Sequence, residues 1–404
     1  MKHYIWLIWA LCLMGLSSCS KEADFYSDNE QDRDADVITG DDYVYHLPVI
    51  FHVLYQDANA TNANGDKSQY IPYSRLKALL DNVNDLYEGA LYGYNSQEGA
   101  SENIHVKFEM ALYDENGKKL STPGVEYIHY NGEYPIDCDT FMKTKKKKGK
   151  IIWDPNEYIN VMVYNFKNTQ TNTITLGISN MPYRANGYPA LEGLEDGGNS
   201  SLMSKSNLSF EYCLSLNSSF IYDESTRYTD PEHGNGTDGY QYISTDANVT
   251  LAHELGHYLG LHHVFAEQKG SDGLEPADNC TDTDYCSDTK SYNKVAYDDW
   301  KSKYILAHQE KKDYDMKELI KRSNDQGVTW NSDNFMDYAI CLSYRFTPEQ
   351  KNRIRQVLYY SPLIPGPKKN RNSDKQTRAN DDEIIDLPIC LAVDRIPITD
   401  ITAE

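Results

Sequence analysis

The stretch from Leu251 to His263 reads LAHELGHYLGLHH and contains the pattern H-E-x-x-H-x-x-G-x-x-H. Residues four apart lie on one face of a helix, so the first two histidines of the pattern, His253 and His257, can bind one metal ion. Gly260 can adopt a positive φ, which ends the helix and returns the chain with His263 as a third nitrogen ligand. Three protein ligands leave the fourth position of a tetrahedral Zn²⁺ open, which is typical of catalytic zinc. The pattern therefore predicts a zinc hydrolase.

Two neighbours of these ligands need separate interpretations. Glu254 directly follows the first ligand and is predicted to be the general base that takes a proton from zinc-bound water. His262 is an alternative third ligand because it is adjacent to His263, but the G-x-x-H spacing favours His263. Another arrangement among such enzymes takes its third ligand from a downstream glutamate, which is not needed if His263 binds.

A second informative segment is NFMDY at residues 334–338. In metzincins, a methionine-containing turn forms an apolar floor beneath the zinc-binding histidines. The zinc motif continues into His-His-Val-Phe, and Cys341 and the segment FTPEQ at 346–350 follow the turn. Together these pieces resemble the pappalysin, or cytophagalysin, branch of the metzincins. Weaker similarities at 48–53 and 176–182 extend the resemblance over about residues 45–365.

This resemblance implies a fold and further site residues. The fold class would be α+β, a metzincin-type zincin with a mixed twisted sheet, a backing helix, an active-site helix and an irregular C-terminal subdomain after the zinc motif. Met336 would be the Met-turn residue. Tyr338 would lie near the metal, either as a catalytic donor to the oxyanion or as an orienting residue. An extended substrate would lie along a sheet edge near Leu176–Ser179.

One segment departs from the family pattern. The family commonly has Asp-Thr-Pro after the zinc motif, whereas this chain has Asp288-Thr289-Lys290. In relatives this region can bind calcium, so Asp282, Asp284 and Asp288 are candidate oxygen ligands for Ca²⁺. Solvated carboxylates in a polar loop are the alternative interpretation.

The N-terminus predicts export and lipid attachment. Lys2 and His3 precede an apolar run that is too short to span a bilayer and is typical of a signal peptide. The following Leu16-Ser17-Ser18-Cys19 resembles a bacterial lipobox, with Cys19 as the lipidated first residue; an ordinary signal peptide is the alternative. The expected localisation is an outer membrane lipoprotein, surface-exposed or periplasm-facing.

Six cysteines remain outside the leader and the lipid site: Cys138, Cys213, Cys280, Cys286, Cys341 and Cys390. An even number in an exported protein permits up to three disulfides, and spacing leaves their connectivity open. The family resemblance implies at least one bridge between the 280–286 loop and the region of Cys341.

Hydrophobic periodicity predicts the main elements. Strands are expected at 48–55, 104–112 and around 159–163, and helices at 74–91, from Asp246 through the zinc motif, around 313–322, and from Thr347. Thr347-Pro348-Glu349-Gln350 is a capping box with proline at the first helical position. The remainder of 267–334 is expected to be mostly loop, and an apolar segment at 384–393 to add a strand.

The chain then divides into a signal peptide (1–18), an acidic flexible tether (19–44), a catalytic domain (45–367, upper part 45–263 and lower part 264–367) and a tail (368–404). The net charge of -22 argues against nucleic acid as a partner. We expect a monomeric zinc endopeptidase that acts on extracellular or periplasmic proteins and is held at the membrane by Cys19. The alternatives are a catalytically silent surface-binding lipoprotein with structural zinc and a non-peptidase zinc hydrolase.

Overall fold

The computed structural model describes residues 43–89, 99–146, 150–168, 173–184, 191–197, 203–225, 240–270, 273–281, 284–311, 313–366, 384–395 and 401–403. The predicted signal peptide, Cys19 and nearly all of the tether lie outside these residues. Within them, no helix combines the length and the apolar character needed to cross a membrane.

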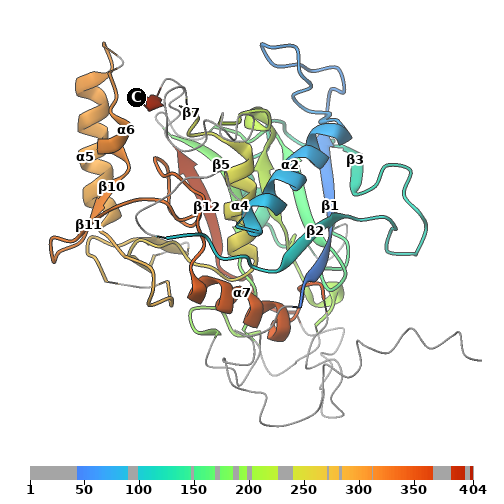
Figure 1. The fold of residues 1–404 in the computed structure, drawn as a ribbon. Coiled ribbons are helices and arrows are strands. Elements are labelled where there is room, and N and C mark those ends of the chain that lie inside the picture. The colour runs from blue at the N-terminus through green and yellow to red at the C-terminus, as the bar shows by residue number, and fades with distance from the viewer. Residues whose placement is uncertain are drawn as a thin grey trace, which may run out of the picture. The chain divides into compact units, whose positions relative to one another are not determined.

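A seven-stranded mixed sheet forms the centre of the fold, in the order β12-β5-β6-β4-β1-β2, with β3 also paired to β1 (Figure 1). Its strands are β1 (Tyr45–Tyr55), β2 (Val106–Met110), β3 (Val125–His129), β4 (Ile159–Tyr164), β5 (Ile174–Asn180), β6 (Leu214–Asn217) and β12 (Cys390–Arg395). Strands β2, β3 and β4 pair with β1 in parallel, and β6 pairs with β4 in parallel. Strand β5 is antiparallel to β6, and β12 is antiparallel to β5. The α+β mixed sheet predicted from the sequence is therefore present.

Strand β1 is buried more completely than the sequence predicted. The alternating residues Val49, Phe51 and Val53 are fully buried, as expected, but His52 and Leu54 on the opposite face are fully buried too. His52 is accommodated because its Nδ1 pairs with Glu126 at 2.8 Å and its Nε2 with the Asn160 side chain at 3.0 Å. A strand with parallel neighbours on both sides is typically covered on both faces, which explains the difference.

Two helices, α2 (Tyr73–Tyr87) and α4 (Ala247–Tyr258), lie side by side against the sheet (Figure 1). The predicted apolar stripe of α2 is buried, and its Tyr87 hydroxyl donates to the Ala252 carbonyl of α4 at 3.0 Å. Helix α2 ends earlier than the predicted Leu91, because Gly89 adopts a φ of +68° directly after it. Helix α4 begins as predicted, since the Asp246 side chain accepts from two backbone N–H groups of its first turn.

The region after α4 contains more regular structure than predicted. It holds α5 (Lys294–His308), α6 (Met316–Leu319), the hairpin β8–β9 (Glu267–Lys269, Leu274–Pro276), the hairpin β10–β11 (Lys321–Ser323, Thr329–Asn331) and α7 (Pro348–Tyr360). Helix α5 was missed, and the helix predicted at 313–322 is only the short α6. The reason is that α5 has no buried apolar stripe: its buried residues are Lys294 and Lys301, whereas Trp300 and Leu306 are exposed. Helix α7 has the predicted capping box.

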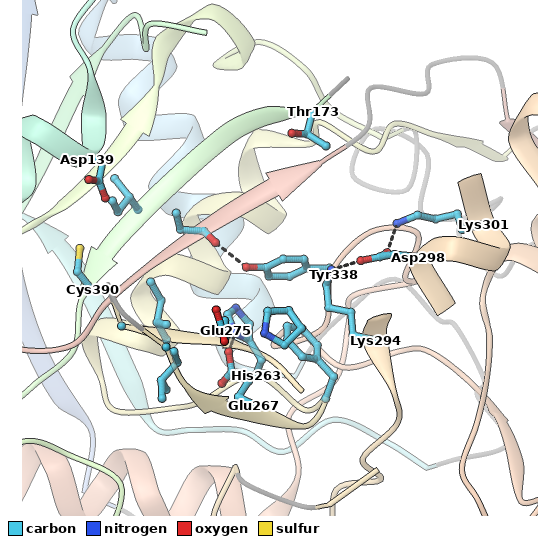
Figure 2. A pocket seen from close by; sticks show the side chains of 18 of the residues that line it. Asp139, Thr173, His263, Glu267, Glu275, Lys294, Asp298, Lys301, Tyr338 and Cys390 are labelled. Carbon is cyan, nitrogen blue, oxygen red and sulfur yellow. Dashed lines mark hydrogen bonds and ion pairs between the residues drawn. The ribbon is translucent and has the colours of Figure 1, made fainter. Parts of the chain in front are cut away.

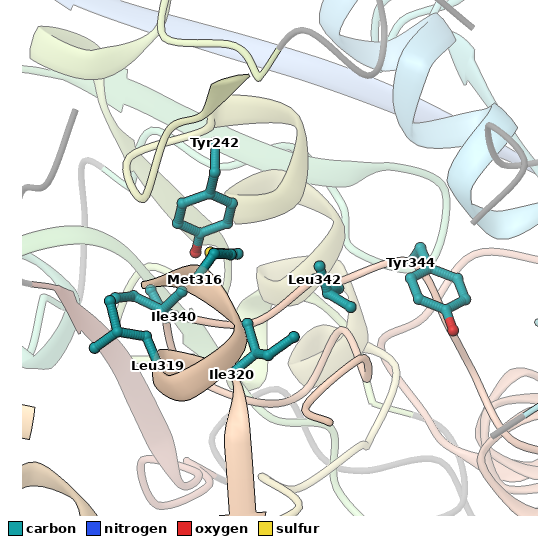
Figure 3. Close-up of a cluster of buried hydrophobic side chains, with 8 residues drawn as sticks. Tyr242, Met316, Leu319, Ile320, Ile340, Leu342 and Tyr344 are labelled. Carbon is teal, nitrogen blue, oxygen red and sulfur yellow. The ribbon is translucent and has the colours of Figure 1, made fainter. Parts of the chain in front are cut away.

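A small apolar cluster fixes α6 against the chain that follows the Met turn (Figure 3). Its buried members are Tyr242, Met316, Leu319, Ile320, Ala339, Ile340, Leu342 and Tyr344. Tyr242 comes from β7 (Tyr240–Tyr242), which pairs with β13 (Ile401–Ala403). The other short elements are α3 (Cys138–Lys143) and two 3₁₀ turns at Lys205–Asn207 and Ser218–Phe220.

Candidate metal centre

Three buried histidines meet at the C-terminal end of α4. One nitrogen from each of His253, His257 and His263 lies within 4.8 Å of the others, and this is the one such cluster among the described residues. Each of the three rings is nearly inaccessible to solvent. The structure thus brings together the three residues that the sequence predicted as metal ligands.

A separate acceptor orients each ring. His253 Nδ1 donates to the Phe335 carbonyl at 2.6 Å, and His257 Nδ1 donates to the Leu261 carbonyl at 2.7 Å. His263 Nδ1 contacts a carboxylate oxygen of Glu267 at 2.7 Å. Because Nδ1 is engaged in every ring, Nε2 is the nitrogen that each can offer to a metal.

The charge state of His257 also suits a metal. The pKa of His257 is lowered to about 3 by burial and by the neighbouring His263. Metal ligation requires the neutral imidazole, so a buried, neutral ring is already in the form that binds. Three imidazoles, each oriented through Nδ1, form the donor set of a catalytic zinc site, and the residues therefore fit Zn²⁺.

Gly260 makes the turn that returns the third histidine. Its φ is +92°, the left-handed conformation predicted from the sequence. A Cβ at this position would lie 2.6 Å from Val357 Cγ2 of α7, so glycine is required for space as well as for conformation. Arg353 of α7 donates to the Gly260 carbonyl at 2.6 Å. Helix α7 thus holds the turn from outside.

Met336 lies directly under the zinc-motif helix. It is fully buried, and a Cβ added to Gly256 of α4 would collide with its sulfur. The Met336 carbonyl accepts from Val264 N at 3.3 Å, and the preceding Phe335 provides the carbonyl that orients His253. The turn at 334–338 is therefore both an apolar floor and a source of a hydrogen bond to one ligand.

Glu254 is fully buried and lies against β5. A Cβ built on Gly177 would come within 2.7 Å of the Glu254 carboxyl carbon, so only glycine at 177 leaves room for this side chain. The family resemblance implied a sheet edge near Leu176–Ser179 but gave no reason for the glycine. The structure supplies it: Gly177 makes space for the carboxylate beside the histidines.

Tyr338 lies beside the cluster, with its ring 4.7 Å from that of His263 between centroids. Its hydroxyl donates to the Ala392 carbonyl of β12 at 2.5 Å (Figure 2). The Lys294 ammonium lies 4.7 Å above the same ring. The predicted proximity of Tyr338 to the metal ligands is thus observed.

His262 points away from the three ligands. Its Nε2 lies 3.1 Å from the Gly193 carbonyl, and its ring packs on Tyr285. Its pKa is lowered well below the usual range by burial and by the Arg353 charge. The structure therefore favours His263 as the third ligand, as the G-x-x-H spacing predicted.

Glu267 was not predicted as a site residue. It is buried, holds His263 through the contact described above, and has its pKa raised to about 7 by burial. The one feature of the sequence that pointed to Glu267 was its position four residues after the proposed ligand His263. That spacing alone could not identify it, because residues 263–267 do not form a helix.

A buried ion pair between Arg322 and Asp337 supports the Met turn. Arg322 Nε lies 3.2 Å from Asp337 Oδ2, and Asp337 Oδ1 accepts from the Tyr338 backbone N–H and the Tyr292 hydroxyl, each at 2.7 Å. Arg322 also donates to the Ile340 carbonyl at 2.8 Å. Sequence reasoning missed this pair, since its members come from separate segments without a shared motif.

The expected calcium ligands do not form a cluster in the described chain. Asp282 lies outside the described residues. Asp284 accepts from Cys286 N and the Thr289 hydroxyl, and Asp288 accepts from the Thr347 hydroxyl and Glu349 N at the start of α7. Both described carboxylates thus bind protein donors, and Asp288 ties its loop to α7.

The expected disulfide is not formed. All six cysteines from Cys138 to Cys390 are free thiols in the structure. Cys341 Sγ lies 3.3 Å from the Asn334 carbonyl, and Cys280 Sγ lies 3.1 Å from the Asp325 side chain. The prediction of a bridge from the 280–286 loop to Cys341 is therefore wrong for this structure, because these sulfurs contact other partners.

A cavity of about 510 Å³ opens beside His263 (Figure 2). His263, Tyr338 and Phe265 form its inner wall, and Leu391 and Ala392 of β12 border it. The hairpin β8–β9 and charged residues of α5, including Asp298, also line it, as do Asp139 and Lys143 of α3. The site is therefore adjacent to a space that could hold a side chain of a bound molecule.

Part of this region is similar to known metallopeptidases. Residues 229–359 match the family model described as pregnancy-associated plasma protein-A. Extracellular metalloproteases of Arthroderma benhamiae and Trichophyton verrucosum are each 32% identical over 120 residues, which are 29% of this chain. That alignment spans about a third (34%) of the length of these curated relatives.

Solved structures with some similarity were also found. Mature mirolysin of Tannerella forsythia in complex with a cleaved peptide gives a TM-score of 0.43 at 16% identity, with 78% of this chain and 91% of that chain covered. A mutant of promirolysin from the same organism gives 0.44 at 15% identity, with 83% and 88% covered.

Proposed function

We propose that this chain, which carries a pappalysin-type metallopeptidase domain at residues 229–359, is a zinc-dependent endopeptidase acting on proteins outside the cytoplasm. The observation that carries the proposal is the group of three oriented, buried imidazoles with the Glu254 carboxylate on the adjacent helical position. A purely structural zinc site would not need a buried carboxylate next to the ligands, for which the neighbouring strand reserves space with Gly177.

His253, His257 and His263 would hold the metal through Nε2. When bound, zinc supplies a Lewis acid that polarises a carbonyl oxygen and lowers the pKa of water. Glu254 takes the proton from the attacking water and delivers it to the leaving amine. Its burial favours this role, because a carboxylate removed from water is a stronger base than a solvated one.

Tyr338 is proposed as the donor to the developing oxyanion. Its hydroxyl already donates to a peptide carbonyl, that of Ala392, beside the metal ligands. A substrate carbonyl at the same place would receive the same hydrogen bond, which strengthens as negative charge develops on the oxygen. The fixed ring, packed against His263 and Phe265, keeps the hydroxyl in position.

The proposal extends to the place of action. The lipobox-like sequence at residues 16–19 supports attachment of the exported enzyme to the outer membrane through lipidated Cys19, with the catalytic domain facing the periplasm or the outside.

The test is cleavage of a denatured protein by zinc-loaded enzyme. Activity should disappear on chelation and return with zinc. Glu254→Gln should retain stoichiometric zinc but lose activity by several orders of magnitude, as expected on removal of a general base. The same substitution at the exposed Glu310 is the matched control and should leave turnover unchanged. Turnover close to wild type in metal-loaded Glu254→Gln protein would exclude the mechanism.

A further inference from the structure

Strand β5 packs against α4, the helix that carries the first two proposed ligands. Gly177, in the middle of this strand, lies against Glu254. A strand at the edge of a sheet presents backbone N–H and C=O groups that can pair with another extended chain, and many proteins bind peptides in this way. On one side β5 pairs with β6, so its other side is the one a substrate would use.

In this structure the chain's own C-terminal segment occupies that side. Strand β12 pairs with β5 antiparallel, from Cys390 opposite Asn180 to Arg395 opposite Ile174. The residues that precede β12 are also held in place by hydrogen bonds. The Ile389 carbonyl accepts from Met181 N at 2.8 Å, and the Asp386 carbonyl accepts from the Tyr183 hydroxyl at 2.5 Å.

The segment crosses the metal centre with its backbone. The Ala392 carbonyl accepts a hydrogen bond from the Tyr338 hydroxyl (Figure 2). The next residue, Val393, pairs with Gly177, which lies against Glu254. The Ala392–Val393 peptide therefore runs between the proposed oxyanion donor and the strand residue that backs the proposed base. These contacts are the ones that a substrate would need.

Pro388 and Leu391 are the buried side chains of the segment among those described. Leu391 is 3% exposed and borders the cavity described above, whereas Ile384 at the start of the same segment is 48% exposed. The pairing of β12 with β5 and the contact of the Ala392 carbonyl with Tyr338 are made by the backbone, which any peptide could offer equally well. The tail and a substrate are thus competitors for the same donors and acceptors.

We propose that residues 384–395 occupy the substrate-binding edge of β5 as an intramolecular inhibitor, so that the full-length enzyme is latent until this segment leaves. The inference rests on the proposed function, because an inhibitor needs an activity to block. Attachment to the same chain gives the segment an effective concentration on the order of millimolar for a short connection. A separate substrate at lower concentration would therefore compete poorly.

Binding tests the occupancy independently of catalysis. In full-length Glu254→Gln protein, a fluorescent peptide of residues 384–395 should bind weakly, because the attached segment fills the edge. Leu391→Asp in the same background adds a charge at a buried apolar position and should release the segment. We expect this variant to bind the peptide at least ten times more tightly, with faster hydrogen exchange in residues 174–180. Ile384→Asp, the matched exposed substitution, should behave like the parent.

Severing the segment after folding avoids a variant that might not fold. A recognition site for a specific protease, inserted between Lys375 and Gln376, allows the full chain to fold first and be cut afterwards. Gel filtration should remove the fragment. The zinc-loaded remainder should then cleave a denatured protein at least ten times faster, and addition of the 384–395 peptide should reverse the gain.

The outcomes separate the two proposals. Equal peptide binding by the parent and Leu391→Asp proteins, or a severed fragment that stays bound while activity is unchanged, would make β12 a permanent strand and overturn the inference. Tighter peptide binding after release, together with no proteolysis in any zinc-loaded form, would support the occupancy of the edge and contradict the peptidase function instead.

Discussion

Individual side chains around the metal centre are fixed by partners from different segments. The three ligand rings donate to Phe335, Leu261 and Glu267, and a fourth nearby histidine, His262, faces Gly193 instead. Orientation of a ring through its second nitrogen fixes both its tautomer and its direction. The adjacent residues His262 and His263 therefore have different roles, although both are histidines.

The ligand set can be tested by the adjacent histidines. His263→Ala removes a ligand and should reduce zinc affinity by more than the roughly 10- to 100-fold that is typical when only a supporting contact is lost. His262→Ala should keep the metal, since its ring contacts Gly193 and Tyr285. Metal content and competition with a chelator of known affinity measure both variants. Loss of zinc in His262→Ala but not in His263→Ala would reverse the assignment.

Gly177 has no room for a side chain, because Glu254 lies directly against it. Gly177→Ala should place a methyl group against the Glu254 carboxylate. Because such overpacking typically costs about 1–3 kcal/mol, stability should fall, and activity should fall with zinc content unchanged.

The double variant Gly177→Ala/Glu254→Ala is the control for the predicted effect of Gly177→Ala. The smaller side chain makes room for the methyl group, so Gly177→Ala should cost much less stability in this background. Denaturant unfolding of the four proteins in the cycle measures the coupling. An equal cost in both backgrounds would show that the two positions do not interact.

Among the elements, the region between the zinc motif and α7 supports the Met turn. Helices α5 and α6 and the hairpin β10–β11 surround the Met turn, and Arg322 of β10 forms the buried ion pair with Asp337. Arg322 also lies over the Tyr297 ring of α5, 3.8 Å from its centroid. The hairpin thus joins α5 to the turn that supports the metal ligands.

Breaking this pair should be costly. Arg322→Met leaves the Asp337 carboxylate buried without its cation, and removal of one partner of a buried pair typically destabilises by about 3–5 kcal/mol. Urea unfolding of the two proteins measures the difference. The control is Lys303→Met, which removes an exposed pair with Asp299 on α5 and should leave stability unchanged. A similar effect of the two substitutions would mean that the buried pair does not stabilise the turn.

At the scale of the whole molecule, the proposed lipid anchor at Cys19 decides where the protein is located. The lipobox-like segment at residues 16–19 precedes the described residues. We therefore expect Cys19→Ala to release the protein from the membrane fraction or to leave it unprocessed, because lipidation is the proposed anchor. Fractionation with immunoblotting is the measurement, and Cys12→Ala within the leader is the control. Membrane attachment of a processed Cys19→Ala protein would refute lipidation as the anchor.

Local patterns in the sequence were sufficient for the parts of the site whose geometry is local. The spacing of His253 and His257 on one helix, the turn at Gly260 and the capping box at Thr347 each depend on residues within a few positions of one another. Such features follow from helix periodicity and backbone conformation, and the structure has all of them where they were predicted. The stripe that buries α2 belongs to the same class.

Only the tertiary structure decided which distant residues complete the site. The Phe335 carbonyl on His253, the space that Gly177 leaves for Glu254 and the Arg322–Asp337 pair join segments that no local pattern connects. The apolar segment at 384–393 predicted a strand, but not that this strand would pair with β5 beside the histidines. Backbone pairing uses groups that every residue carries, so the sequence could predict an extended segment while its partner and register were set by the folded sheet.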